Sequence, residues 1–159
     1  MLVSLVSVAE SEQDTARLYG IDRWGDGYFH IGRDGHLRVS PRRDPDQSLD
    51  LKKLVDQLGQ RGLDLPILIR FNGILEDRLR RLHECFEQAL AEHAYRAAYR
   101  CVYPIKVNQQ RHVVEKLIQQ GRQFGVGVEA GSKPELVAVM ALTDSATPII
   151  CNGCLLYTS

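Results

Sequence analysis

The sequence predicts an α/β fold built around a parallel sheet, and three observations support this. From residue 66 onward, strand-like and helix-like segments alternate with a repeat of roughly 25 residues. The strand candidates are short and largely apolar, as expected where both faces of a sheet are covered. An isolated hairpin pattern precedes them. An open doubly wound sheet and a closed (β/α) barrel both fit, but eight barrel units need about 250 residues, so at most half a barrel is expected.

The first part of the chain contains one predicted hairpin and one predicted helix. Residues 1–18 indicate a leader without a defined element. The hairpin is expected at 27–41, where Tyr28–Ile31 and His36–Ser40 flank a Gly-Arg-Asp-Gly turn. After a polar loop over 41–48, helical spacing of apolar residues predicts a helix that ends near two glycines: Leu51, Leu54, Val55 and Leu58, followed by Gly59 and Gly62.

The second part of the chain supplies the strands and helices of the predicted parallel sheet. Strands are expected at 67–71, 99–105, 125–129 and 148–151. One apolar helical face is formed by Leu75, Leu79, Leu82, Phe86 and Leu90, and a second by Val113, Val114, Leu117 and Ile118. A third helix should begin at a capping box, in which Ser132 accepts the N–H of Glu135 and Glu135 accepts the N–H of Ser132.

Charge and composition exclude several classes of function. Lys plus Arg and Asp plus Glu both total 20, so no net field favours nucleic acid or an anionic membrane as a partner. No apolar stretch approaches the ~20 residues needed to span a bilayer, and no secretory signal is evident. The four cysteines lack disulfide-framework spacing, which favours the cytoplasm. Cys151 and Cys154 have neither a second pair nor a nearby histidine, so no metal site is predicted.

Lys106 is the candidate reactive residue, because it follows an apolar strand candidate directly. In a barrel, side chains at the carboxyl ends of strands face the active site. A lysine there loses hydration, which favours an uncharged amine able to attack a carbonyl. The alternative is a lysine that extends to solvent. Pro104 lacks a ladder donor, so the strand must bulge or end there, and Asn108 can cap the next helix.

Several segments together resemble the biosynthetic arginine decarboxylases, which are pyridoxal-phosphate enzymes of the alanine-racemase-like barrel class. The motif around the lysine is the most specific part of the resemblance, and the matching blocks occur in the right order. The segments are YGIDRWGDGYFHI (19–31), LPILIRFNGILEDRLRRL (65–82), VYPIKVNQQ (102–110), VEAGSKPEL (128–136) and IICNG (149–153).

The resemblance implies a reaction and roles for two residues. Lys106 would hold pyridoxal 5'-phosphate as a Schiff base, and Glu129 would lie beside the cofactor; alternatively, Glu129 is a polar strand-end group bonded to backbone. The reaction would convert L-arginine to agmatine and CO2, the first step of polyamine biosynthesis. The resemblance also implies a homo-oligomer and Mg2+ as a second cofactor, although the sequence shows no site for the ion. No nucleic-acid or membrane partner is expected.

The resemblance also implies a division of the chain. We expect a leader (1–18), a hairpin segment belonging to a mostly absent β-domain (19–48), the first part of the pyridoxal-phosphate-binding (β/α) barrel (49–153) and a non-native tail (154–159), because the family continues differently after Gly153. Such a fragment is expected to be inactive alone. Three alternatives stay open: a diaminopimelate decarboxylase, an amino-acid racemase, or a non-catalytic pyridoxal-phosphate-binding module.

Overall fold

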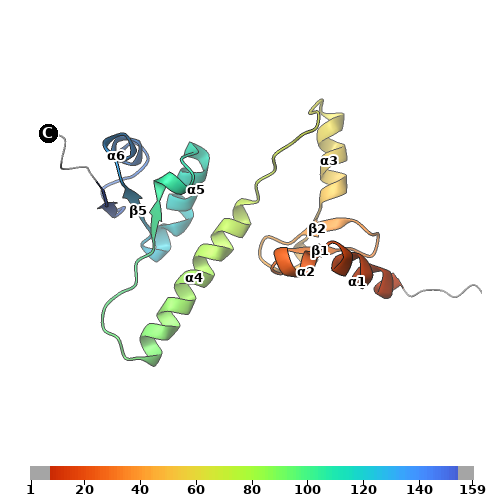
Figure 1. Ribbon diagram of the computed structural model, residues 1–159, viewed down its shortest axis with the longest axis horizontal. Helices are drawn as coiled ribbons and strands as arrows, with labels where there is room; N and C mark the ends of the chain where they lie inside the picture. Colours follow the sequence, from red (N-terminus) through yellow and green to blue (C-terminus); the bar gives the residue numbers. More distant parts are fainter. Residues whose placement is uncertain (1–7, 154–159) are drawn as a thin grey trace, which may run out of the picture. The chain divides into compact units, whose positions relative to one another are not determined.

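The computed structural model describes residues 8–153, and the chain divides into two compact units between Ile74 and Leu75 (Figure 1). The predicted tail at 154–159 and the first part of the predicted leader lie outside the described residues. The remainder of the leader forms a helix that was not predicted, α1 (Val8–Leu18). No helix within the described range is both long and apolar enough to cross a bilayer.

The first unit contains an antiparallel sheet in the order β1-β2-β3, which comprises β1 (Phe29–Ile31), β2 (Leu37–Val39) and β3 (Leu49–Asp50). The predicted hairpin is confirmed, with Ile31 paired to Leu37. Its turn is closed because the N–H of Gly35, at a φ of 75°, donates to the Gly32 carbonyl (2.8 Å). The two-residue β3 was not predicted, because it is too short to show an alternating pattern.

The helices of the first unit lie against β1 and β2 of this sheet. They are α1, α2 (Ile21–Trp24) and α3 (Leu51–Gln60), and a 3₁₀ turn at Pro45–Gln47 precedes β3. The α3 helix was predicted, and its apolar stripe is the half-buried side of the helix. The core of the unit contains Ile21, Tyr28 and Val39, which are all nearly inaccessible to solvent. Trp24 and Phe29 add a ring contact at 5.1 Å between centroids.

The second unit contains a three-stranded parallel sheet in the order β4-β5-β6, which confirms the predicted α/β class. Its elements are α4 (Asn72–Glu92, which begins in the first unit), β4 (Val102–Pro104), α5 (Arg111–Gly121), β5 (Gly127–Ala130), α6 (Lys133–Met140) and β6 (Ile149–Cys151). Short 3₁₀ turns lie at Ile105–Val107 and Arg122–Phe124. The helices predicted from apolar stripes are therefore all present.

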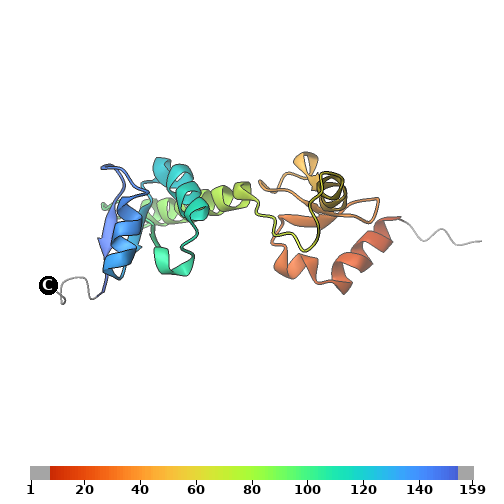
Figure 2. The same ribbon diagram turned by 90° about the horizontal axis from the view of Figure 1, so that it is seen from above.

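Both α5 and α6 cover the same face of the parallel sheet, as can be followed in Figure 2. Val128 and Ala130 of β5 are fully buried in one cluster with Val114 of α5 and Val139 of α6. Ile105, at the end of β4, belongs to the same cluster. Because side chains alternate along a strand, the residue between Val128 and Ala130 must point to the opposite face.

The strand predicted at 67–71 is wrong. Ile67, Ile69 and Phe71 are half-buried while Leu68 and Arg70 are exposed, so the side chains alternate as in a strand. However, the backbone pairs with no strand among the described residues. A pattern of side chains predicts an extended conformation, but a sheet also requires a neighbouring strand to take up its N–H and C=O groups.

Candidate active site

Lys106 lies on the 3₁₀ turn that directly follows β4. β4 covers only part of the predicted 99–105 strand and ends at Pro104, as expected for a residue without an N–H. The preceding Ile105 is 1% exposed, whereas the Lys106 side chain is 66% exposed. The turn is therefore anchored by one buried apolar side chain. The predicted loss of hydration at Lys106 is not found in the described chain, where the side chain extends to solvent.

Glu129 is the residue of β5 that points away from the helices, and it faces Lys106. In the parallel register, Glu129 is opposite Pro104, two residues before the lysine. Its Oε1 atom lies 4.0 Å from Lys106 Nζ, and its side chain is 18% exposed. The structure thus brings the two predicted site residues together at the carboxyl edge of the sheet, as a pair in which the acid is sheltered and the amine is accessible.

The segment after Lys106 is tied back to β4. The Tyr103 hydroxyl donates to the carbonyl oxygen of Asn108 (3.3 Å), and burial raises the pKa of Tyr103. The predicted capping role of Asn108 is corrected by the structure: Gln110 occupies the N-cap position of α5, and Asn108 Oδ1 accepts the N–H of Gln110 (3.0 Å). Asn108 therefore shapes the turn before the helix and does not bond to the helix itself.

The predicted capping box at α6 is present in a modified form. Ser132 Oγ accepts the N–H of Glu135 at 3.4 Å, as predicted. Glu135 Oε2, however, accepts the N–H of Gly131 at 2.7 Å, one residue before the expected donor. This bond holds the loop that leaves β5 immediately after the strand that carries Glu129. Sequence reasoning assigned Glu135 to the helix cap only.

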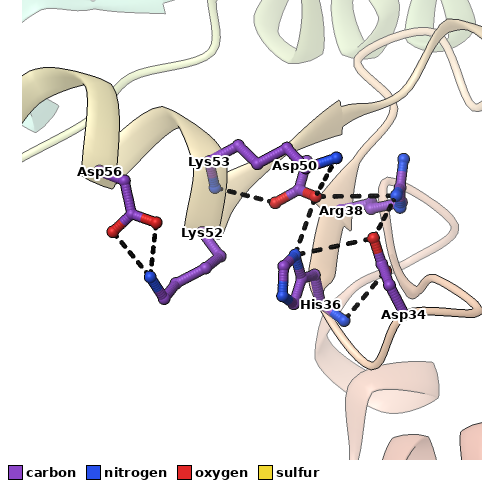
Figure 3. A network of polar contacts seen from close by, with 7 residues as sticks. All are labelled: Asp34, His36, Arg38, Asp50, Lys52, Lys53 and Asp56. Carbon is purple, nitrogen blue, oxygen red and sulfur yellow. Dashed lines mark hydrogen bonds and ion pairs between the residues drawn. The ribbon is translucent and has the colours of Figure 1, made fainter.

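A second polar cluster, which the sequence did not predict, lies in the first unit (Figure 3). Asp50 Oδ2 lies 2.9 Å from His36 Nδ1, and Asp34 Oδ2 lies 2.8 Å from Arg38 Nη2. Asp50 is also the N-cap of α3, where its Oδ1 accepts the N–H of Lys53 (3.0 Å). That bond, and the one with His36, lower the pKa of Asp50 to about 2 although burial acts in the opposite direction.

This cluster does not fit a Mg2+ ion. Ligand atoms of Asp34, His36 and Asp50 lie within 4.8 Å of one another. However, Arg38 Nη2 and Lys53 Nζ each lie 3.7 Å from Asp50 Oδ2, so two cationic groups already face that carboxylate. Mg2+ prefers oxygen ligands in octahedral geometry, and neighbouring cations would repel it. The cluster is instead an ion-pair network that stabilises the start of α3. The Cys151–Cys154 pair cannot be placed, because Cys154 lies outside the described residues.

Comparison with known proteins identifies the family. The model of the pyridoxal-binding domain of pyridoxal-dependent decarboxylases matches residues 76–155. A biosynthetic arginine decarboxylase of Rhodopirellula baltica is 60% identical to this chain, and the match covers 90% of this chain and 21% of the relative. A biosynthetic arginine decarboxylase of Prochlorococcus marinus (strain MIT 9303) is 52% identical, and the match covers 88% of this chain and 22% of the relative. The crystal structure of the biosynthetic arginine decarboxylase from Campylobacter jejuni matches with a TM-score of 0.78 and 32% identity, over 86% of this chain and 22% of that chain.

These matches also define what the chain represents. It spans about a fifth of the length of the relatives it matches. The family model matches residues 76–155, which include both predicted site residues, Lys106 and Glu129. The chain belongs to the pyridoxal-dependent decarboxylase family, and residues 76–155 correspond to the pyridoxal-binding domain of that family.

Proposed function

We propose that this chain forms the first part of the pyridoxal-phosphate-binding (β/α) barrel of a biosynthetic arginine decarboxylase. The complete protein would convert L-arginine to agmatine and CO2, the first step of polyamine biosynthesis. The names of the relatives from Rhodopirellula and Prochlorococcus support arginine as the substrate. They favour it over the diaminopimelate decarboxylase and racemase alternatives, and over a non-catalytic module.

The observation that carries the proposal is the presentation of one primary amine at the carboxyl edge of the sheet. Buried Ile105 fixes the turn, and Lys106 projects from it with Glu129 at 4.0 Å. An accessible amine beside a single carboxylate has the chemistry needed to bond to the aldehyde of pyridoxal phosphate, so these residues fit the cofactor. When bound, the cofactor supplies an electron sink for the carbanion that forms as CO2 leaves.

The side chains of this chain would bind the cofactor and handle protons. Lys106 would hold the cofactor covalently through Nζ, and the same Nζ would be placed to carry a proton to or from the reacting carbon. Glu129 attracts the ammonium form of Lys106 and keeps Nζ close to the sheet edge. Because the acid is the more buried partner, its position is set by β5 and not by solvent.

The barrel assignment is supported by the second unit. Its strands are parallel in chain order and its helices cover one face, which is the arrangement in a (β/α) barrel. Val137 and Met140 on α6 and Ile150 on β6 are exposed, as expected where a further strand and helix would pack. We further propose that the hairpin of the first unit joins a β-domain, that the complete protein is a cytoplasmic homo-oligomer, and that it has no nucleic-acid or membrane partner.

The proposal is tested on the full-length protein with Lys106→Ala and the control Lys116→Ala. Lys116 is an exposed lysine of α5 whose Nζ donates to Gln119 Oε1 (3.2 Å), so its loss should not alter the site. Borohydride reduction of the wild type with pyridoxal phosphate should label the peptide that contains Lys106. CO2 release from arginine should fall by about a thousandfold or more in Lys106→Ala alone, since a covalent catalyst is lost.

Two results would overturn the proposal. Labelling of another lysine, or of none, would remove Lys106 from the cofactor site. Normal cofactor labelling with turnover of diaminopimelate, or with racemisation in place of CO2 release from arginine, would keep the site and replace the substrate.

A further inference from the structure

The end of β5 is bonded from two sides, and Glu135 supplies one of these bonds. Glu135 Oε2 accepts the N–H of Gly131 at 2.7 Å, and Asn152, after β6, donates its N–H to the carbonyl of Ala130 at 3.0 Å. Ala130 and Gly131 are the two residues directly after Glu129. The backbone that aims the Glu129 carboxylate is therefore held by a side chain of α6 and by the neighbouring strand end.

Gly131 allows these two bonds to form together. A Cβ atom at this position would lie 3.2 Å from the Asn152 carbonyl oxygen and 3.4 Å from Glu135 Oε2. The 3.2 Å distance is shorter than most contacts that Cβ atoms make in proteins. The loop after β6 also packs tightly here, because a Cβ atom on Gly153 would meet the Gly131 carbonyl oxygen at 2.4 Å. The end of β5 is therefore closely packed against the backbone after β6 as well as bonded to Glu135.

We propose that Glu135 is a positioning residue for the Glu129–Lys106 pair, an inference that rests on the function proposed above. Glu135 accepts the Gly131 N–H and thereby fixes the end of β5, which sets where Glu129 Oε1 meets Lys106 Nζ. A helix cap alone would bond the N–H of Ser132, the first residue outside α6. The bond made one residue earlier reaches the strand that carries the site acid.

The chain offers a matched control for this proposal, because Ser132 forms the other half of the helix start. Ser132→Ala removes the N-cap acceptor, so it destabilises α6 without touching the Gly131 N–H. Glu135→Ala removes the acceptor of Gly131, Glu135→Gln keeps an acceptor oxygen at the same reach, and Glu135→Asp keeps the charge near the helix N-terminus but shortens the side chain by one methylene.

The experiment uses the full-length holoenzyme and resolves hydrogen exchange at the Gly131 amide. Glu135→Ala should increase Gly131 exchange and lower kcat for arginine about tenfold with little change in KM, because misplacing a catalytic group weakens the reaction more than binding. Glu135→Gln should recover kcat to within about threefold and keep Gly131 protected. Ser132→Ala should lower the melting temperature but leave both readouts unchanged. Glu135→Asp should behave like Glu135→Ala.

The outcomes separate this inference from the proposed function. Faster Gly131 exchange in Glu135→Ala with unchanged kcat would overturn positioning, while cofactor labelling at Lys106 in the wild type would leave the function standing. If Glu135→Gln is impaired while Glu135→Asp is active, the charge of residue 135 matters and the bond to Gly131 does not. This result would also overturn the positioning role of Glu135. If Glu135→Ala does not fold, the Gln and Asp variants decide. Absence of Lys106 labelling in the wild type would instead defeat the function itself.

Discussion

The two units each place a sheltered carboxylate beside basic groups, but they use it differently. In the first unit, Asp50 has a 7% exposed side chain and lies 2.9 Å from His36 Nδ1, while it also caps α3. In the second unit, Glu129 Oε1 lies 4.0 Å from Nζ of Lys106, whose side chain is 66% exposed. Close, multiple bonds make the first carboxylate part of the structure. The second carboxylate has a looser contact and its amine partner is accessible to solvent, which is why we propose chemistry for the parallel unit.

Burial also distinguishes two apolar residues of the turn that carries Lys106, Ile105 and Val107. Ile105 is 1% exposed within the core cluster, whereas Val107, at the other end of the turn, is 69% exposed. Ile105→Ala should therefore lower the free energy of unfolding by about 2–5 kcal/mol, whereas Val107→Ala should change it by less than about 0.5 kcal/mol. Denaturant unfolding of the full-length protein, followed by hydrogen exchange of peptides from the second unit, measures both. Equal losses from the two variants would show that the turn is not anchored by burial.

Asp50→Ala is expected to have the next largest effect, and it should act on the first unit. The change removes the N-cap acceptor of α3 and leaves His36, Arg38 and Lys53 without their shared carboxylate. We expect a fall of several degrees in melting temperature and faster exchange in peptides covering α3, with cofactor labelling at Lys106 unchanged. Loss of cofactor labelling in this variant would mean that the network of the first unit also supports the site.

The particular elements show what could be predicted from the sequence. Helices α3, α4 and α5 were predicted because their apolar stripes reflect burial of one face, which is local information. The strand at 67–71 was wrong and β3 was missed, since strands depend on partners distant in the sequence. The proximity of Lys106 and Glu129 follows from the rule that parallel strands end at one edge, whereas their catalytic roles stay predictions.

The polar contacts were harder to predict than the elements. A capping-box pattern does not distinguish the N–H of Ser132 from that of Gly131, because the two donors lie one residue apart and the Glu135 side chain can reach both. The network around Asp50 joins residues from separate strands, so their spacing in the chain gives no signal. The one available clue was an aspartate directly before a predicted helix, which is a common N-cap.

Acid should weaken the network around Asp50, and this effect should be smaller than that of Asp50→Ala. The pKa of Asp50 in the folded chain, about 2, lies below its ordinary value of 3.8, so its ionised form stabilises the fold at higher pH. That contribution should be fully present above about pH 4 and lost as the pH falls from there toward 2. The protection of peptides covering β2 to α3, corrected for the intrinsic pH dependence of amide exchange, should therefore fall between about pH 4 and pH 2 more in the wild type than in Asp50→Asn. An identical acid response in Asp50→Asn would assign the loss to other carboxyl groups.

The smallest effect is expected at the ion pair between Lys52 and Asp56 on the outer face of α3. Both side chains are more than half exposed, although Lys52 Nζ reaches Asp56 Oδ1 at 2.7 Å (Figure 3). Solvent screens such a pair, and ordering two long side chains costs entropy, so Lys52→Ala should reduce the free energy of unfolding by at most about 0.5 kcal/mol, and less in high salt. Asp50 is the N-cap of α3, and Lys52 and Asp56 lie within the helix. Melting curves of Lys52→Ala and Asp50→Ala therefore compare an exposed pair at a short distance with a sheltered carboxylate that makes several bonds. Suppose Lys52→Ala lowered the melting temperature as much as Asp50→Ala did. The distance between the charged atoms, and not shelter from water, would then set the strength of these pairs. The contrast between Asp50 and Glu129 would have to be explained by their distances only.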